Sequence, residues 1–72
     1  MIELRAPMSG KVWKLECKQG EQVQQDDPVI ILEAMKMETE LFSPASGVVQ
    51  EIRVKAGDAV DEDAVLLVIA ES

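Results

Sequence analysis

The chain has 72 residues, which is room for one small domain with a thin core, because a chain of this size buries only about 60% of its unfolded surface. Its 14 acidic and 7 basic residues give a net charge of −7, which argues against a nucleic-acid partner, since phosphate binding needs a basic face. The sequence has no His, no Tyr and a single Cys, so we expect neither catalytic residues nor a metal site.

The same composition bears on location. Cys17 is the only cysteine and cannot form an intramolecular disulfide, which is typical of proteins in reducing compartments. The longest apolar runs, residues 29–32 and 64–70, are far shorter than the roughly 20 residues of a membrane span, and the amino end lacks a leader-like pattern. We therefore expect a soluble, cytoplasmic protein with no membrane contact, folded as a single domain over residues 1–72. Its acidic surface favours solubility, or alternatively steers it towards a basic face on a partner enzyme.

From residue 6 onward the chain repeats itself without a gap at an offset of 37 residues. Residues 6–12 and 43–49 both carry a Pro, a Ser and a Gly at the same spacing. Further matches run through both halves: Val12 with Val49, Leu15 with Ile52, Cys17 with Val54, Gly20 with Gly57, Val23 with Val60, Asp26 with Asp63, and residues 29–32 with 66–69. A register this long predicts two similar halves related by a pseudo-two-fold axis.

Each half contains short apolar stretches separated by turn residues. The turns of the first half are expected at Gly10, residues 18–21 and residues 26–28, and those of the second at Gly47, residues 55–58 and residues 61–63. This spacing predicts an all-β fold, a small sandwich or flattened barrel.

The alternation of apolar residues breaks between Val12, which is even-numbered, and Leu15 and Cys17, which are odd-numbered. The second half breaks in the same way. One extra residue at a β-bulge in each strand would bring all the apolar residues to the core face. Cys17 is then a core residue, with a reactive or metal-binding thiol as the alternative. Trp13 matches Gln50 in the repeat, so its position need not be internal.

The middle of the chain gives two conflicting indications. Residues 29–41 have apolar residues at helical spacing and contain many good helix formers. The repeat instead favours a strand, because the matching residues 65–69 are short and rich in β-branched side chains. No helix cap precedes the run. We therefore predict strand, turn, strand, with the turn at Met35 and Lys36.

Met-Lys is a poor sequence for a tight hairpin turn, where Asn-Gly or Asp-Gly adopts the required positive φ angles more readily. A pair of residues unsuited to its turn suggests a function other than folding. The alternative is that Met35 and Met37 are core residues and Lys36 is an ordinary surface charge.

The tetrapeptide Ala34, Met35, Lys36 and Met37 resembles the attachment motif of the biotin carboxyl carrier family, the biotinyl domains of biotin-dependent carboxylases. Residues 20–23 and 57–60 resemble the two glycine turns of that family. Residues 6–10 resemble its entry turn, and residues 43–47 resemble the segment that follows its lysine hairpin. The resemblance extends from about residue 2 to residue 69.

The resemblance implies two four-stranded antiparallel sheets, a barrel-sandwich hybrid, with the lysine on an exposed hairpin and the termini at the opposite end. It implies that biotin protein ligase attaches biotin to Lys36 and reads Glu33, Ala34, Met35 and Met37. The domain would then carry a carboxyl group between biotin carboxylase and carboxyltransferase, and would not itself be an enzyme. The gapless repeat leaves no room for the thumb loop that some bacterial carriers contain.

Lipoyl carrier domains of 2-oxoacid dehydrogenase complexes use a lysine on an equivalent hairpin and often have an acid three residues before it, like Glu33. Beside the lysine they usually have an acidic residue before and an alanine after, where this chain has Met35 and Met37. Biotin is therefore the expected cofactor and lipoate the alternative. A third reading is a small structural or inhibitory domain whose lysine is never modified.

Overall fold

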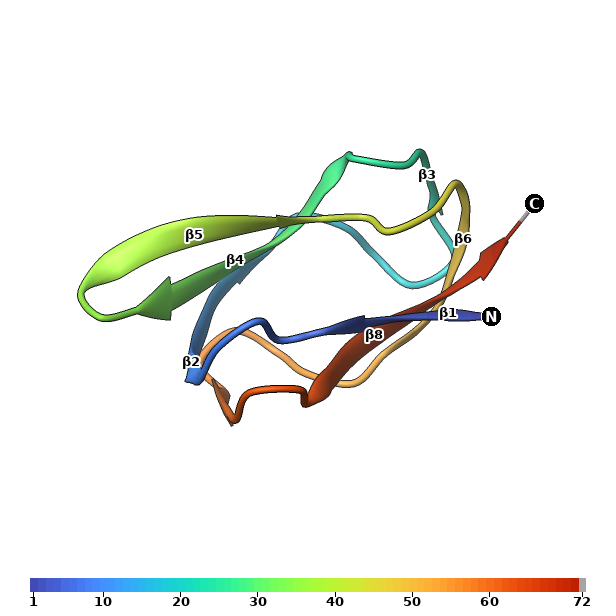
Figure 1. Ribbon diagram of the computed structural model, residues 1–72. Helices are drawn as coiled ribbons and strands as arrows, with labels where there is room; N and C mark the ends of the chain where they lie inside the picture. Colours follow the sequence, from blue (N-terminus) through green and yellow to red (C-terminus); the bar gives the residue numbers. More distant parts are fainter. Residues whose placement is uncertain (72) are drawn as a thin grey trace.

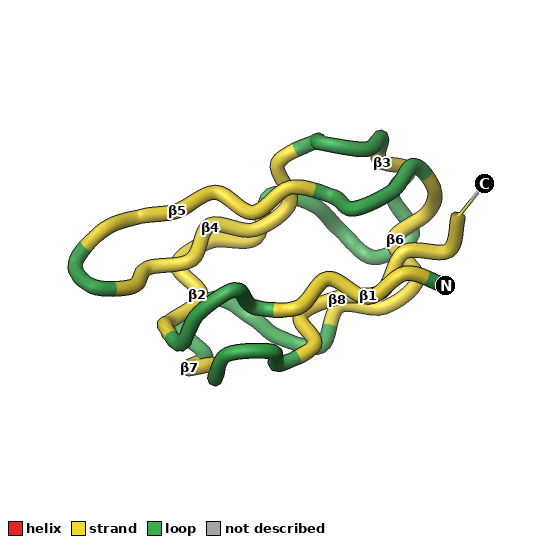
Figure 2. The backbone as a smooth tube through the Cα atoms, in the orientation of Figure 1, coloured by secondary structure: helices red, strands yellow, loops and turns green. Residues whose placement is uncertain are grey.

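The computed structural model describes residues 1–71, which form eight β-strands in two antiparallel sheets (Figures 1 and 2). The strands are β1 (Ile2–Arg5), β2 (Gly10–Leu15), β3 (Gln22–Val23), β4 (Pro28–Ala34), β5 (Met37–Phe42), β6 (Gly47–Ile52), β7 (Ala59–Val60) and β8 (Val65–Glu71). One sheet has the order β1-β8-β6-β3 and the other β5-β4-β2-β7. Over the described residues the sheets pair as a sandwich without closing into a barrel, which confirms the predicted all-β class. Within the same residues, no helix is long and apolar enough to cross a membrane.

The predicted two-fold repeat determines how the strands are distributed. At the 37-residue offset, strands β1, β2, β3 and β4 match strands β5, β6, β7 and β8. Exchanging each strand for its match turns the strand order of one sheet into that of the other. Each sheet consequently contains two strands from each half of the chain. Neither half has a complete sheet of its own, so the two halves are interleaved and depend on each other.

Hydrogen bonds at the glycine turns follow the same symmetry. The N–H of Gly20 donates to the carbonyl of Val49 at 2.8 Å, and the N–H of Gly57 donates to the carbonyl of Val12 at 2.7 Å. Both glycines have positive φ, 88° and 99°, a conformation that strains residues with a side chain. The glycine turn of each half is thereby attached to a central strand of the other half.

The two predicted bulges are present, at Trp13 and at Gln50. The register of β2 against β4 shifts between Val12 and Lys14, and the register of β6 against β8 shifts between Val49 and Glu51. Val12 and Val49 are each 1% exposed, and the residues that follow the bulges pack partly against the same core. The extra residue therefore keeps both apolar sets on the inner face, as the broken alternation predicts.

Apolar side chains from both sheets fill the space between them. The largest fully buried apolar side chains belong to Val12, Val29, Ile30, Leu32, Val49, Leu66, Leu67 and Ile69. Cys17 is buried in the same cluster, which confirms it as a core residue. Burial raises the pKa of the Cys17 thiol and the charge of Glu21 raises it further, so the thiol stays protonated at neutral pH.

Replacing Val49 with Ala is expected to lower the free energy of unfolding by about 1–3 kcal/mol, because it removes buried methyl groups and leaves a cavity. Urea denaturation followed by circular dichroism measures this loss. The neighbouring Val48 is 37% exposed and provides the matched control, since Val48→Ala should change stability by less than about 0.5 kcal/mol. Equal losses in both variants would contradict the placement of Val49 in the core.

Candidate functional site

Strands β4 and β5 form a hairpin that projects from one end of the sandwich (Figure 1). They pair from Pro28 with Phe42 up to Ala34 with Met37, which leaves Met35 and Lys36 as a two-residue turn. The Cα atoms extend 35 Å along the longest axis and 17 and 16 Å across it. The start of β1 and the end of β8 lie at the end opposite the hairpin (Figure 1). The strand-turn-strand prediction is confirmed, and the helical reading of residues 29–41 is wrong.

The turn requires positive φ at both of its residues, 53° at Met35 and 64° at Lys36. Positive φ at both central residues of a two-residue hairpin loop is the mark of a type I′ turn, in which Asn-Gly and Asp-Gly are preferred. A side chain in this left-handed region costs about 1–2 kcal/mol per residue. The paired strands on either side hold the turn in this conformation. Met35 and Lys36 therefore stay at the tip although Met and Lys prefer negative φ.

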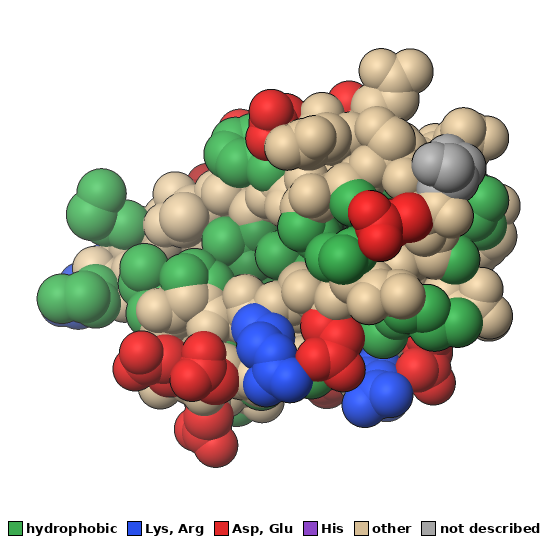
Figure 3. Space-filling model, turned by 45° about the vertical axis from the view of Figure 1, so that its right-hand side comes forward, with side chains coloured by type: hydrophobic (Ala, Val, Ile, Leu, Met, Phe, Trp, Pro, Cys, Tyr) green, Lys and Arg blue, Asp and Glu red, His purple; other side chains and the backbone are tan. Residues whose placement is uncertain are grey.

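Side chains at the tip are in solvent. Met35 is 89% exposed, Met37 is 69% exposed, and Lys36 is exposed as well. At the narrow end of the molecule, on the left of Figure 3, hydrophobic side chains stand clear of the body with a basic side chain behind them. The alternative in which both methionines belong to the core is therefore wrong.

The base of the hairpin is packed from within. Ala34 is 7% exposed and Leu32 is fully buried, so the inner side of β4 is covered up to the last residue before the turn. Gly10, the first residue of β2, lies against this point, because a Cβ there would be 2.5 Å from the Glu33 carbonyl oxygen and 3.1 Å from the Ala34 Cβ. Only a glycine allows β2 to approach the hairpin so closely. Its role was missed by the sequence analysis, although its match with Gly47 indicated a position with a structural demand.

The remaining residues predicted for ligase recognition fall on two sides of β4. Glu33 is exposed and lies opposite Glu38 of β5. Ala34 faces inward beneath the turn. An enzyme that approaches the tip can touch Glu33, Met35 and Met37, whereas Ala34 acts through the position of the hairpin.

Chemically, the tip presents a solvent-exposed primary amine. Within residues 1–71 the Lys36 side chain makes no hydrogen bond, and the two ion pairs involve other residues, Arg5 with Glu3 and Arg53 with Glu51. A lysine amine reacts as a nucleophile only when deprotonated. This arrangement suits acylation of Lys36 by a reagent that another protein has already activated.

The sequence model of the family described as biotin-requiring enzymes matches residues 2–69. The chain belongs to this family. The match covers the lysine hairpin and both glycine turns, so it includes every element from which the site is built.

The chain is also similar to two carboxylase proteins and to a lipoyl domain. The biotin carboxyl carrier protein of acetyl-CoA carboxylase from Solanum lycopersicum is 58% identical over 33 residues, which are 46% of this chain and 47% of that protein. The Kluyveromyces lactis urea carboxylase structure superposes with a TM-score of 0.90 at 36% identity, covering 96% of this chain and 6% of that one. The lipoyl domain of the 2-oxoglutarate dehydrogenase complex from Azotobacter vinelandii superposes with a TM-score of 0.84 at 30% identity, covering 99% and 98%. The chain thus spans less than half of each carboxylase relative and nearly all of the lipoyl domain.

Replacing Met35 with Asn is expected to raise the free energy of unfolding by about 0.5–1 kcal/mol, because Asn adopts positive φ more readily than Met. Denaturant midpoints at unchanged m-value measure the gain. Met37→Asn is the matched control, since residue 37 is an exposed strand residue outside the positive-φ pair and should give no gain. A loss of stability in Met35→Asn would contradict the conclusion that the turn is strained at this residue.

Proposed function

We propose that the protein is a biotin carrier, biotinylated on Lys36, that transfers a carboxyl group between a biotin carboxylase and a carboxyltransferase. The observation that supports this most directly is the exposed Lys36 at a strained turn between Met35 and Met37, in a chain of the biotin-requiring enzyme family. The similarity to an acetyl-CoA carboxylase carrier and to a urea carboxylase supports the carboxylase class.

Attachment is an acyl transfer to the chain's own lysine. The ammonium group of Lys36 first gives up one proton, and its Nζ attacks the carboxyl carbon of biotinyl-AMP. The C–O bond to AMP breaks, AMP leaves with the bonding electrons, and the nitrogen releases a second proton as the neutral amide forms. The ligase therefore has to supply both the activated acyl group and an acceptor for these protons. The modification removes one positive charge and takes the domain from −7 to −8.

The domain contributes position and confinement. Biotin supplies the nitrogen that holds the carboxyl group, while the hairpin determines where that nitrogen can reach. Gly10 and Ala34 fix the base of the hairpin, so little order is lost when an enzyme binds the tip. Attachment to a carrier also raises the local concentration of the carried group at each enzyme site.

A lipoyl carrier is the second candidate, and the Azotobacter lipoyl domain favours it, because the two folds superpose over nearly their whole lengths. The fold therefore does not choose between the cofactors. The choice falls on the side chains at the tip, where Met35 and Met37 stand at the positions that lipoyl carriers usually fill with an acid and an alanine. These two residues support biotin.

Co-expression with biotin protein ligase is expected to add the mass of one biotinyl group, read by intact mass spectrometry. Lys36→Arg should add none, because the guanidinium cannot be acylated in its place. Lys55→Arg, at an exposed lysine in one of the glycine turns, is the matched control and should be biotinylated like the unaltered protein. An unmodified wild-type chain, or biotin retained by Lys36→Arg, would contradict the proposal.

The double change Met35→Asp and Met37→Ala is expected to shift modification from biotin towards lipoate. Thermal stability should not fall, since both side chains are exposed at the tip. The wild type and the variant are each incubated with both ligases and both cofactors, and the products are weighed. Exclusive biotinylation of the variant would show that other residues select the cofactor, and modification of neither protein would favour the unmodified structural domain.

A further inference from the structure

The two-fold repeat provides an internal comparison between the outer faces of the two sheets. Both faces are built on the same strand order and carry bulges at the same point, so positions 37 residues apart have the same structural environment. A difference between equivalent side chains is therefore not demanded by the fold. Such differences indicate a function carried by one face alone.

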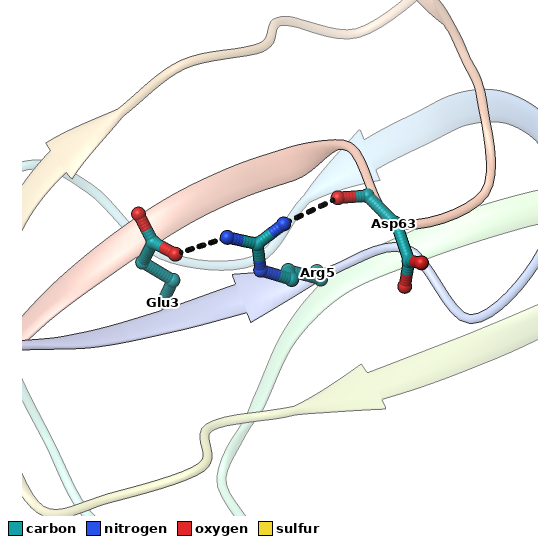
Figure 4. Close-up of polar contacts among 3 residues, drawn as sticks. All are labelled: Glu3, Arg5 and Asp63. Atoms are coloured by element: carbon teal, nitrogen blue, oxygen red, sulfur yellow. Dashed lines mark hydrogen bonds and ion pairs between the residues drawn. The ribbon is translucent and has the colours of Figure 1, made fainter.

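On the outer face of β1, β8 and β6, the charged side chains of Glu3, Arg5, Glu51 and Arg53 form two ion pairs. Val68 lies at the centre of this face, between Glu3 of β1 and Glu51 of β6. Glu3 pairs with Arg5 at 2.6 Å, and Glu51 pairs with Arg53 at 2.9 Å. Arg5 also donates to the carbonyl oxygen of Asp63 at 3.1 Å, which ties β1 to the turn before β8 (Figure 4). Residues of this face, with Gln50 of the bulge, line a shallow groove.

The outer face of β5, β4 and β2 has an aromatic side chain at two of the equivalent positions. Ile31 lies at its centre, between Lys14 and Glu40. The bulge in β2 puts Trp13 beside Lys14 and opposite Ile31. Phe42 follows Glu40 by two residues and shares its face.

Trp13 and Phe42 stand where the other face has Gln50 and Arg5. They are the only Trp and the only Phe in the chain, and they are 51% and 50% exposed. Aromatic residues left in water at this extent are the kind that protein interfaces enrich. The fold does not need them there, because Gln and Arg fill the same positions in the other half.

Between these aromatic residues and the lysine turn, the same face is acidic. Glu33 and Glu38 lie directly opposite each other on β4 and β5, and like charges so placed destabilise a sheet. Lys11 lies on the other side of Glu33 and offsets only part of this repulsion. The residues equivalent to Glu33 and Glu38 are Ala70 and Met1. Met1 lies before β1, so only Glu33 has a counterpart within a strand, and that counterpart, Ala70 of β8, carries no charge. A cation supplied by a partner would relieve the repulsion.

We propose that this aromatic face, formed by Trp13, Ile31, Phe42 and the carboxylates of Glu33, Glu38 and Glu40, docks on the biotin carboxylase. The complementary surface is an apolar recess bordered by Lys and Arg side chains. This inference rests on the proposed carrier function. The ligase has to reach the amine at the tip itself, whereas the carboxylase reacts at the far end of the extended biotinyl side chain and has to hold the body of the carrier.

The position of the aromatic face fits this task. Ile31 precedes Lys36 by five residues, so the centre of the face lies about 15 Å from the turn along the strand. A partner that covers the face stands beside the tip and leaves the modified lysine free to enter a recessed active site. A face of three strands gives a small contact, which suits a carrier that has to dissociate after each turnover.

The test replaces the aromatic residues with those that the other half carries at the same positions, Trp13→Gln with Phe42→Arg. The matched control, Val48→Lys, removes an exposed apolar side chain from the opposite face and installs the residue type found at the equivalent Lys11. Wild type and both variants are biotinylated with ligase and confirmed by intact mass. ATP hydrolysis by the biotin carboxylase of the source organism is then measured against the concentration of each carrier, with free biotin as a reference substrate.

The aromatic variant is expected to raise KM at least about tenfold with kcat changed less than about twofold, and Val48→Lys should leave both within about twofold. The wild-type KM should also rise with salt, because the acidic part of the face meets basic groups. If circular dichroism shows that the aromatic variant is unfolded, Glu38→Gln with Glu40→Gln replaces it in the test. This variant keeps the side-chain shapes and should also raise KM.

Each contrary outcome has a distinct reading. Full biotinylation with equal KM for wild type and aromatic variant overturns the docking proposal and leaves the carrier function standing. Failure of the wild type to accept biotin overturns both. Slower biotinylation of the aromatic variant with unchanged KM would assign the face to the ligase, and a wild-type dimer that the variant loses would assign it to a second copy; either result overturns the proposal.

Discussion

The exchange of hydrogen bonds between the two halves is the constraint on which the rest of the structure depends. The glycine turn of each half is bonded to a central strand of the other through Gly20 with Val49 and Gly57 with Val12. Val12 and Val49 are also among the most buried side chains, so polar and apolar contacts between the halves meet at the same residues. The lysine turn connects β4 of the first half to β5 of the second, and its conformation is imposed by this interleaved frame.

Most of the fold could be predicted because the repeat supplies information that local propensity lacks. Residues 29–41 have a helical spacing, yet the short β-branched match in the second half identified the strand and hence the turn. The broken alternation after Val12 also identified the bulges. The mixing of strands from both halves within each sheet could not be predicted, because an apolar pattern shows which face of a strand is buried and does not show which strand lies beside it.

The sequence predicted the exposed residues of the candidate site but not the contacts beneath them. Lys36 and its methionines were singled out by the resemblance of residues 34–37 to the biotin attachment motif, and the poor fit of Met-Lys to a tight turn agreed with it. The contact of Gly10 with the base of the hairpin depends on a tertiary approach that no spacing along the chain reveals. The aromatic face could not be predicted either. Trp13 and Phe42 stand out only when the two outer faces are compared position by position, which requires the structure.

The pairing of β1 with β8 repeats the pairing of β5 with β4, so the open ends of these strands occupy the place that the lysine turn occupies in the other sheet. The lysine turn and the open ends of β1 and β8 are thus at opposite poles of the same symmetric body. Any polypeptide continuing from either end leaves the domain at the pole away from Lys36, and two such continuations would leave side by side. The fold therefore accommodates a linker at one end or at both ends without bringing it near the lysine turn.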